Sequence, residues 1–263
     1  MKNHIAKTAD GVPIHYDVHR EGTTALVFVH GWCGNRHAWD HQMGHFAPRH
    51  TVVSLDLAGH GTSGRDRTRW SMPAFGQDVV AVVEQLGLQR VVLIGHSMGG
   101  SVIVEAARRL PNTVIGLVGV ETWHDVERIR TLAEVAEFLA PFRTDFAKAT
   151  RDLARLAFVP TSDPALSEDY VRDVSRFPPD IAIAVWEEYK DHDRVLQERL
   201  QAVRVPKIAI NSTYPLTTNV EAAQRCGIEV VLMSGTGHFV MIEDPQTFSR
   251  LLNEALKAIV HQV

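Results

Sequence analysis

Six short apolar runs, rich in β-branched residues, constrain the fold of this chain more than any other feature. They are ALVFVH (25–30), TVVSLDL (51–57), VVLIGH (91–96), TVIGLVGV (113–120), KIAIN (207–211) and EVVLMS (229–234). Such unbroken runs are typical of parallel strands that are covered on both faces. Helical patterns separate several of them, at 72–87, 101–110 and 246–260. The alternation predicts an α/β fold, with a mostly parallel, twisted sheet and helices on both faces.

Two segments depart from this alternation. The run VPIHYDVH (12–19) alternates roughly between polar and apolar residues and predicts an antiparallel hairpin at a sheet edge. Residues 123–205 carry apolar side chains at helical spacing, without a β-like run. We therefore expect a core domain at 1–122 and 206–263, with a helical cap at 123–205 inserted after the sixth strand. The cap is expected over the carboxyl ends of the strands, where open α/β sheets bind ligands; helices on a flank are the alternative.

The composition narrows the classes of partner. The 263 residues are 45% hydrophobic and 22% charged with a net charge of −4, which gives no electrostatic reason to expect nucleic acid. No apolar run approaches ~18 residues, so no membrane span is expected. The first residues lack the apolar core of a signal peptide, so a cytoplasmic location is expected. Cys33 and Cys226 make no metal-binding spacing and are expected as free thiols. Monomer and homodimer both stay open.

The segment GHSMGG (95–100) directly follows the apolar run VVLI. A strand followed by G-x-S-x-G and a helix is the pattern of a nucleophile elbow. Gly95 and Gly99 lack side chains where the strand and helix pack closely, so the turn is expected to expose the Ser97 hydroxyl. A capping serine in a glycine-rich loop is the alternative. The flanking strand and helix favour the nucleophile.

A serine nucleophile needs a base within hydrogen-bond reach, and His238 is the candidate. It follows the last predicted strand in SGTGHF, on a loop expected at the same sheet edge as Ser97. With these motifs the sequence resembles the α/β-hydrolase superfamily, and within it the serine carboxylesterase-like members, whose chain order is nucleophile, acid, histidine. The resemblance implies that Ser97 attacks and His238 accepts its proton. An ordinary loop histidine is the alternative for His238.

The loop HGWCGN (30–35) extends the resemblance. In this family the His-Gly turn leads into one side of the oxyanion hole. Carried over to this chain, the backbone N–H groups of Trp32 and Met98 are the two donors to the developing oxyanion. DLAGHGTSG (56–64) matches a further turn of the family, which implies a structural rather than catalytic role for His60.

The acid of the expected triad departs from the family pattern. Many relatives have it in a G-x-x-D turn after the penultimate strand, but this region reads INSTYPLT (210–217), with Tyr214 at the expected place. Glu121 ends the apolar run in GLVGVETW, and haloalkane-dehalogenase-like branches use an acid at the end of that strand. We therefore predict Glu121, which would hold the tautomer of the imidazole. Asp125, Glu221 and a dyad without an acid are the alternatives.

These residues predict a cofactor-free serine hydrolase that cleaves carboxylic esters through an acyl-enzyme intermediate. The dehalogenases and epoxide hydrolases of this fold have aspartate at the elbow. The serine in this chain implies acyl transfer instead. Small to medium-sized acyl esters are the expected small-molecule substrates. Lactone hydrolysis, carbon–carbon bond hydrolysis and perhydrolysis use the same groups and stay open. A non-catalytic small-molecule binding protein is the alternative from another class.

Aromatic and histidine residues outside the expected triad suggest two further features. Trp123, Trp186 and Phe239 are candidates for the lining of the substrate pocket. Three histidines spaced four apart, at 37, 41 and 45, are expected on one partly exposed helix face. No carboxylate triad accompanies these histidines and Pro48 follows soon after, so no metal site is expected.

Overall fold

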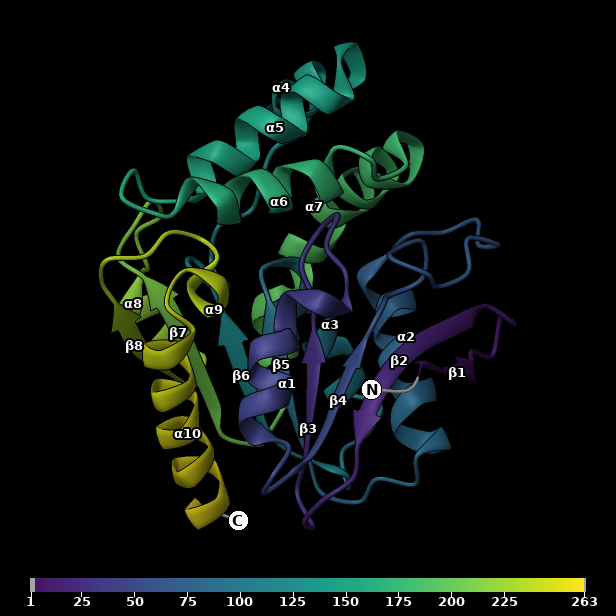
Figure 1. The fold of residues 1–263 in the computed structure, drawn as a ribbon, viewed down its shortest axis with the longest axis vertical. Coiled ribbons are helices and arrows are strands. Elements are labelled where there is room, and N and C mark those ends of the chain that lie inside the picture. The colour runs from purple at the N-terminus through teal and green to yellow at the C-terminus, as the bar shows by residue number, and fades with distance from the viewer. Residues whose placement is uncertain (1–2, 263) are drawn as a thin grey trace.

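Each apolar run of the sequence forms a strand of one eight-stranded sheet in the computed structural model, which describes residues 3–262 (Figure 1). The strands are β1 (Asn3–Lys7), β2 (Pro13–His19), β3 (Ala25–Val29), β4 (Thr51–Leu55), β5 (Val91–His96), β6 (Val114–Val120), β7 (Lys207–Ser212) and β8 (Ile228–Met233). Their order across the sheet is β1-β2-β4-β3-β5-β6-β7-β8. β1 pairs antiparallel with β2, and β2 with β4, whereas all other neighbours are parallel. The mostly parallel sheet and its antiparallel edge hairpin are confirmed.

The two faces of the sheet bury separate apolar clusters. Along β3, the side chains of Ala25, Val27 and Val29 join one cluster, and those of Leu26 and Phe28 join the other. This alternation follows from the period of two residues along a strand. Each fully buried large side chain contributes about 1.5–3 kcal/mol to folding. The sheet is therefore stabilised from both sides, as the unbroken apolar runs predict.

Helices cover both faces, as predicted. One face carries α2 (Met72–Gln85), α3 (Met98–Ala107) and α8 (Val220–Arg225). The other carries the 3-10 helix η1 (Arg36–Trp39) and the helices α1 (Asp40–Phe46), α9 (Val240–Glu243) and α10 (Pro245–Gln262). No helix described between residues 3 and 262 combines the length and the apolar character needed to cross a bilayer.

Four further helices lie between β6 and β7 in the chain. They are α4 (Leu132–Thr144), α5 (Phe146–Ala157), α6 (Pro164–Val174) and α7 (Pro179–Ala202). Figure 1 shows them beyond the arrowheads of the parallel strands, over the carboxyl edge of the sheet. A capping box begins α4, since Thr131 and Glu134 satisfy each other's backbone N–H groups. These helices form the cap; its folding as a separate domain stays a prediction.

The histidine face expected at 37, 41 and 45 is not part of one continuous helix, so that prediction is wrong. His37 lies in η1, where Asn35 caps the turn by accepting a hydrogen bond from the His37 N–H group. The α-helix starts afresh at Asp40, after Trp39 leaves helical geometry with φ −111° and ψ 8°. All three histidines are exposed.

Candidate active site

Ser97 lies at the sharp turn from β5 into α3. Its φ of 52° and ψ of −117° fall in a region that residues with a side chain rarely occupy. Glycines on both sides make the turn sterically possible. A Cβ at Gly95 would collide with the Gly99 carbonyl oxygen, and a Cβ at Gly99 would come within 2.6 Å of the Val29 carbonyl oxygen. The turn therefore has the strained form expected of a nucleophile elbow.

Glu121 and His238 form a hydrogen-bonded pair at the same sheet edge. Glu121 directly follows β6, and His238 lies on the loop between β8 and α9. The distance from His238 Nδ1 to Glu121 Oε2 is 3.1 Å. The Glu121 side chain is fully buried, and its other oxygen accepts a hydrogen bond from the Ser212 N–H group. A buried carboxylate needs such donors, so the site holds it where it can fix the His238 ring.

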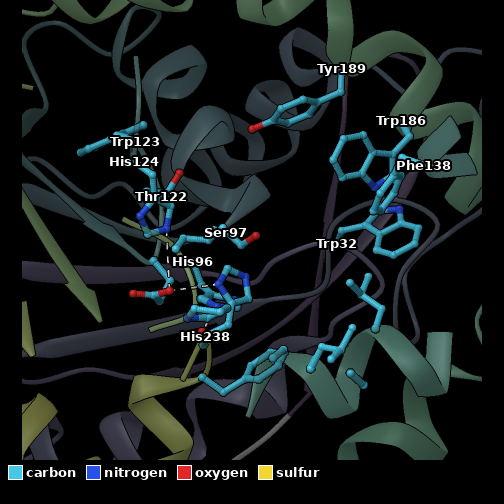
Figure 2. A pocket seen from close by; sticks show the side chains of 18 of the residues that line it. Trp32, His96, Ser97, Thr122, Trp123, His124, Phe138, Trp186, Tyr189 and His238 are labelled. Carbon is cyan, nitrogen blue, oxygen red and sulfur yellow. Dashed lines mark hydrogen bonds and ion pairs between the residues drawn. The ribbon is translucent and has the colours of Figure 1, made fainter. Parts of the chain in front are cut away.

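Ser97 and His238 line one cavity, and Figure 2 shows both beside His96. Within the described part of the chain, no hydrogen bond joins the Ser97 hydroxyl to the His238 ring. Catalytic hydrogen bonds of this kind often tighten only when substrate binds. Rotation about the Ser97 Cα–Cβ bond is the motion that reorients the hydroxyl.

The glycine-rich loop after β3 passes directly against the serine. A Cβ at Gly31 would come within 3.1 Å of the Ser97 Cβ atom, so the neighbouring Trp32 backbone is beside the nucleophile. Met98 is the first residue of α3, and N–H groups in the first turn have no partner inside the helix. The Trp32 ring is held at the cap by a 3.0 Å hydrogen bond to the Ala182 carbonyl oxygen. Donation by these two backbone amides to an oxyanion stays a prediction.

A cavity of about 580 Å³ lies between Ser97 and the cap helices. All three residues expected in the pocket line it, namely Trp123, Trp186 and Phe239. An aromatic group forms one wall, with the Phe138 and Trp186 rings 4.2 Å apart and Trp32 beside them (Figure 2). Such a wall suits an apolar group of a ligand.

Burial keeps the imidazoles around the pair uncharged. It lowers the pKa of His96 well below the usual value, and the nearby His238 lowers it further. His96 Nε2 lies 2.8 Å from the His238 carbonyl oxygen, so this nitrogen carries the proton and supports the loop. Burial also lowers the pKa of His124, which lies on the other side of Glu121. Both rings are therefore neutral at pH 7.

Glu243, which no motif of the sequence indicates, organises the His238 loop. Glu243 Oε1 accepts hydrogen bonds from the N–H groups of Gly237, at 2.9 Å, and of Phe239, at 3.2 Å. The His238 N–H group donates to the Ala157 carbonyl oxygen of α5 at 2.6 Å. The only signal in the sequence is an acid in the first turn after the loop, a position that favours hydrogen bonds to free N–H groups.

The other candidate acids form no hydrogen bond with His238 in the described structure, although Asp125 lines the same cavity. Asp125 is exposed and accepts a hydrogen bond from the Glu127 N–H group. Glu221 is exposed on α8, and Tyr214 is 40% exposed. Among the carboxylates considered, Glu121 is the one that the described structure joins to His238.

Glu121 and His238 also form, together with His124, a group of side chains that could bind a metal ion. One atom each of Glu121, His124 and His238 lies within 4.8 Å of the other two. His124 Nε2 is 3.7 Å from Glu121 Oε2, is buried, and has no hydrogen-bond partner in the described chain. The two cysteines, Cys33 and Cys226, are free and buried.

Comparison with known proteins places this geometry in context. A model of the alpha/beta hydrolase family matches residues 26–251. A bifunctional esterase/perhydrolase from Acinetobacter calcoaceticus is 39% identical over 107 residues, which are 40% of this chain and 39% of that protein. The chain spans 28% to 41% of the length of the curated relatives it matches.

Solved structures share the fold over nearly the whole chain. A thermophilic esterase from Thermogutta terrifontis has a TM-score of 0.84 at 19% identity, covering 98% of this chain and 99% of that one. An enzyme described as degrading N-acyl homoserine lactones has a TM-score of 0.81 at 25% identity, covering 95% and 99% of the two chains.

Proposed function

We propose that this chain, which belongs to the alpha/beta hydrolase family, is a serine hydrolase. In this proposal it cleaves carboxylic esters through an acyl-enzyme intermediate. The observation that carries the proposal is the placement of Ser97 and the Glu121–His238 pair on one cavity. The aromatic wall of that cavity and its volume of about 580 Å³ support small to medium-sized acyl esters. The esterases among the relatives agree with this reaction class.

The reaction follows from the roles of these groups. Ser97 Oγ attacks the ester carbonyl carbon while His238 Nε2 accepts the hydroxyl proton. The negative charge that develops on the carbonyl oxygen is stabilised by the backbone N–H groups of Trp32 and Met98. His238 then gives its proton to the departing alcohol, which leaves an acyl group on Ser97. Water cleaves the acyl-enzyme by the same proton transfers, and Glu121 stabilises the imidazolium in both halves.

Lactone hydrolysis is the second candidate. A lactone is an internal ester, and opening it needs the same serine, imidazole and amide groups. The structural neighbour that degrades N-acyl homoserine lactones favours this candidate, since it is 25% identical over 95% of this chain. A lactone with an apolar acyl side chain would place that chain against the aromatic wall.

Steady-state hydrolysis of p-nitrophenyl acetate, butyrate and octanoate, together with a homoserine lactone carrying a short acyl chain, tests the proposal. We expect turnover of the acetate or butyrate ester, and a loss of about 10⁴-fold or more in Ser97→Ala. Equal turnover in Ser97→Ala would contradict the proposed nucleophile. A folded wild-type protein without turnover of any of these compounds would favour the non-catalytic binding protein. Preference for the lactone would favour the second candidate.

A further inference from the structure

The buried carboxylate of Glu121 lies between two imidazoles, although the proposed reaction uses one. His238 Nδ1 is 3.1 Å from Glu121 Oε2 on one side, and His124 Nε2 is 3.7 Å from the same oxygen on the other. The three ligating atoms all lie within 4.8 Å of one another. Figure 2 shows His124 and His238 on the same side of the cavity.

His124 carries the polar atom that the proposed reaction leaves unexplained. Its Nε2 atom is buried without a hydrogen-bond partner in the described chain, although buried polar atoms normally have one. Its Nδ1 atom lies 3.1 Å from Thr218 Oγ1, which fixes the ring from behind. Asn211 Nδ2 donates to the same hydroxyl oxygen at 3.1 Å. A metal-binding imidazole usually has its second nitrogen fixed by a hydrogen bond, and here Thr218 fixes Nδ1 while Nε2 faces Glu121.

The geometry points to a binding site for Zn²⁺ formed by Glu121 Oε2, His124 Nε2 and His238 Nδ1. Two ligands on a tetrahedral zinc ion, each at about 2.0–2.1 Å, are about 3.3–3.4 Å apart. The two spacings to the Glu121 oxygen, 3.1 and 3.7 Å, are close to this value. The third spacing, between the ligating atoms of His124 and His238, is at most 4.8 Å, so it reaches this value when the His124 ring moves toward His238 by up to about 1.4 Å. Water from the cavity would take the fourth position.

Zinc at this site inhibits the hydrolase, and this part of the inference rests on the proposed function. In the reaction His238 keeps a proton on Nδ1, donated to Glu121, and offers the lone pair of Nε2 to Ser97. Binding of Zn²⁺ to Nδ1 moves that proton to Nε2, so the ring stays neutral with the opposite tautomer. The Nε2 atom then carries a proton and can no longer accept one from Ser97. The ion is thus an inhibitor at the triad and not a resident cofactor.

Isothermal titration of ZnCl₂ into the full chain tests the site apart from the activity. We expect one ion bound per chain in the wild type, unchanged binding in Ser97→Ala, and affinity at least about 10-fold weaker in His124→Asn. The matched control is His41→Asn, which removes an exposed imidazole on α1 and is expected to bind as the wild type does. Equal affinity in His124→Asn and the wild type, or no binding at 100-fold molar excess, would overturn the site.

Turnover of p-nitrophenyl acetate tests the inhibition. We expect added ZnCl₂ to reduce wild-type turnover and EDTA to restore it, with His124→Asn needing at least about 10-fold more zinc for the same loss. Inhibition that weakens equally in His41→Asn would instead indicate surface binding and overturn the inference. The protein could also bind one zinc ion per chain in a His124-dependent way and yet hydrolyse no ester. That result would contradict the proposed function but support the zinc site.

Discussion

Glu121 illustrates how the acid of a triad can come from a neighbouring strand. The turn after β7 offers no carboxylate, and Ser212 at its start instead donates its N–H group to Glu121. The strands β6 and β7 are adjacent and parallel, so their carboxyl ends lie side by side. A residue that follows β6 therefore reaches the same imidazole. The left-handed φ of 50° at Glu121 turns its side chain into the buried position.

Replacement of Glu121 by glutamine tests its role at the residue scale. The amide keeps the shape of the side chain but removes the charge that stabilises an imidazolium and fixes its tautomer. We expect kcat for p-nitrophenyl acetate to fall about 10³–10⁴-fold in Glu121→Gln. Asp125→Asn, an exposed carboxylate four residues later, is the matched control and should stay near the wild-type rate. If kcat instead falls in Asp125→Asn and stays near the wild-type value in Glu121→Gln, Asp125 is the acid of the triad.

The site residues that were predicted from the sequence have signals in neighbouring residues, whereas the site residues that were missed do not. Ser97 stands in a short motif between a strand and a helix, and His238 follows the last strand, so both are visible in the chain order. Glu121 was predicted from two signals together: a charged residue ends a buried run, and the haloalkane-dehalogenase-like branches that the sequence resembles have an acid at that strand end. The contacts of Glu243 and His124 depend on loop conformations that bring distant segments together, and no spacing in the sequence encodes these.

At the scale of elements, the cap and the His238 loop are joined through the backbone. His238 donates its N–H group to the carbonyl oxygen of Ala157, the last residue of α5. Gly237 passes so close to the same oxygen that a Cβ there would collide with it. The end of α5 therefore helps to position the imidazole, so the cap does more than line the cavity.

Gly237→Ala tests this junction. The new methyl group must displace either α5 or the His238 loop, because the obstacle is backbone and not a flexible side chain. We expect kcat to fall at least about 10-fold and the free energy of unfolding to fall by about 1–3 kcal/mol. Gly44→Ala is the control, since nothing lies within 4 Å of a Cβ there and its helical position favours alanine. Wild-type kinetics in Gly237→Ala would show that the junction does not position His238.

The sequence predicted the elements of the sheet better than those of the cap. Six apolar runs and the alternating segment at 12–19 predicted the seven strands from β2 to β8, each boundary within two residues. The strand order did not follow from the pattern, since it depends on long-range pairing. In the cap, helical spacing indicated helices, and the prolines at 178 and 179 marked the start of the last one, but the breaks at Asp145 and Asp163 were not predicted. α3 begins at Met98, directly after the strained Ser97, as the elbow motif predicts.

For the whole molecule, several histidines buried in the uncharged form link folding to pH. His192 on α7 is 4% exposed, and burial lowers its pKa to about 4, an effect that the nearby Arg199 and Arg108 reinforce and Glu105 opposes. His192 Nδ1 is 3.9 Å from Glu105 Oε1 and 3.4 Å from Arg199 Nη1. Burial also lowers the pKa values of His30, His60 and His96.

The direction of the pH effect follows from these values. In the unfolded chain the pKa of His192 returns to about 6.5, so the unfolded state binds more protons between pH 6.5 and pH 4. The contribution of neutral His192 to the free energy of unfolding is therefore complete above pH 6.5 and is lost as the pH falls toward 4. Between pH 7 and pH 5 we expect His192 alone to account for about 1–2 kcal/mol. Urea unfolding at the two pH values should show a smaller loss in His192→Gln than in the wild type. An equal loss in both would contradict the assignment, and exposed His41→Gln is the control.

The most direct test of the central claim is the site of covalent labelling by a fluorophosphonate. The full-length wild-type protein would be treated with the probe and its intact mass measured. After digestion, mass spectrometry of the peptides would locate the adduct. The account predicts one adduct per chain, on the peptide containing Ser97, and labelling at least about 10²-fold slower in His238→Gln, which lacks the base. An adduct on another serine, or a folded protein that stays unlabelled, would contradict it.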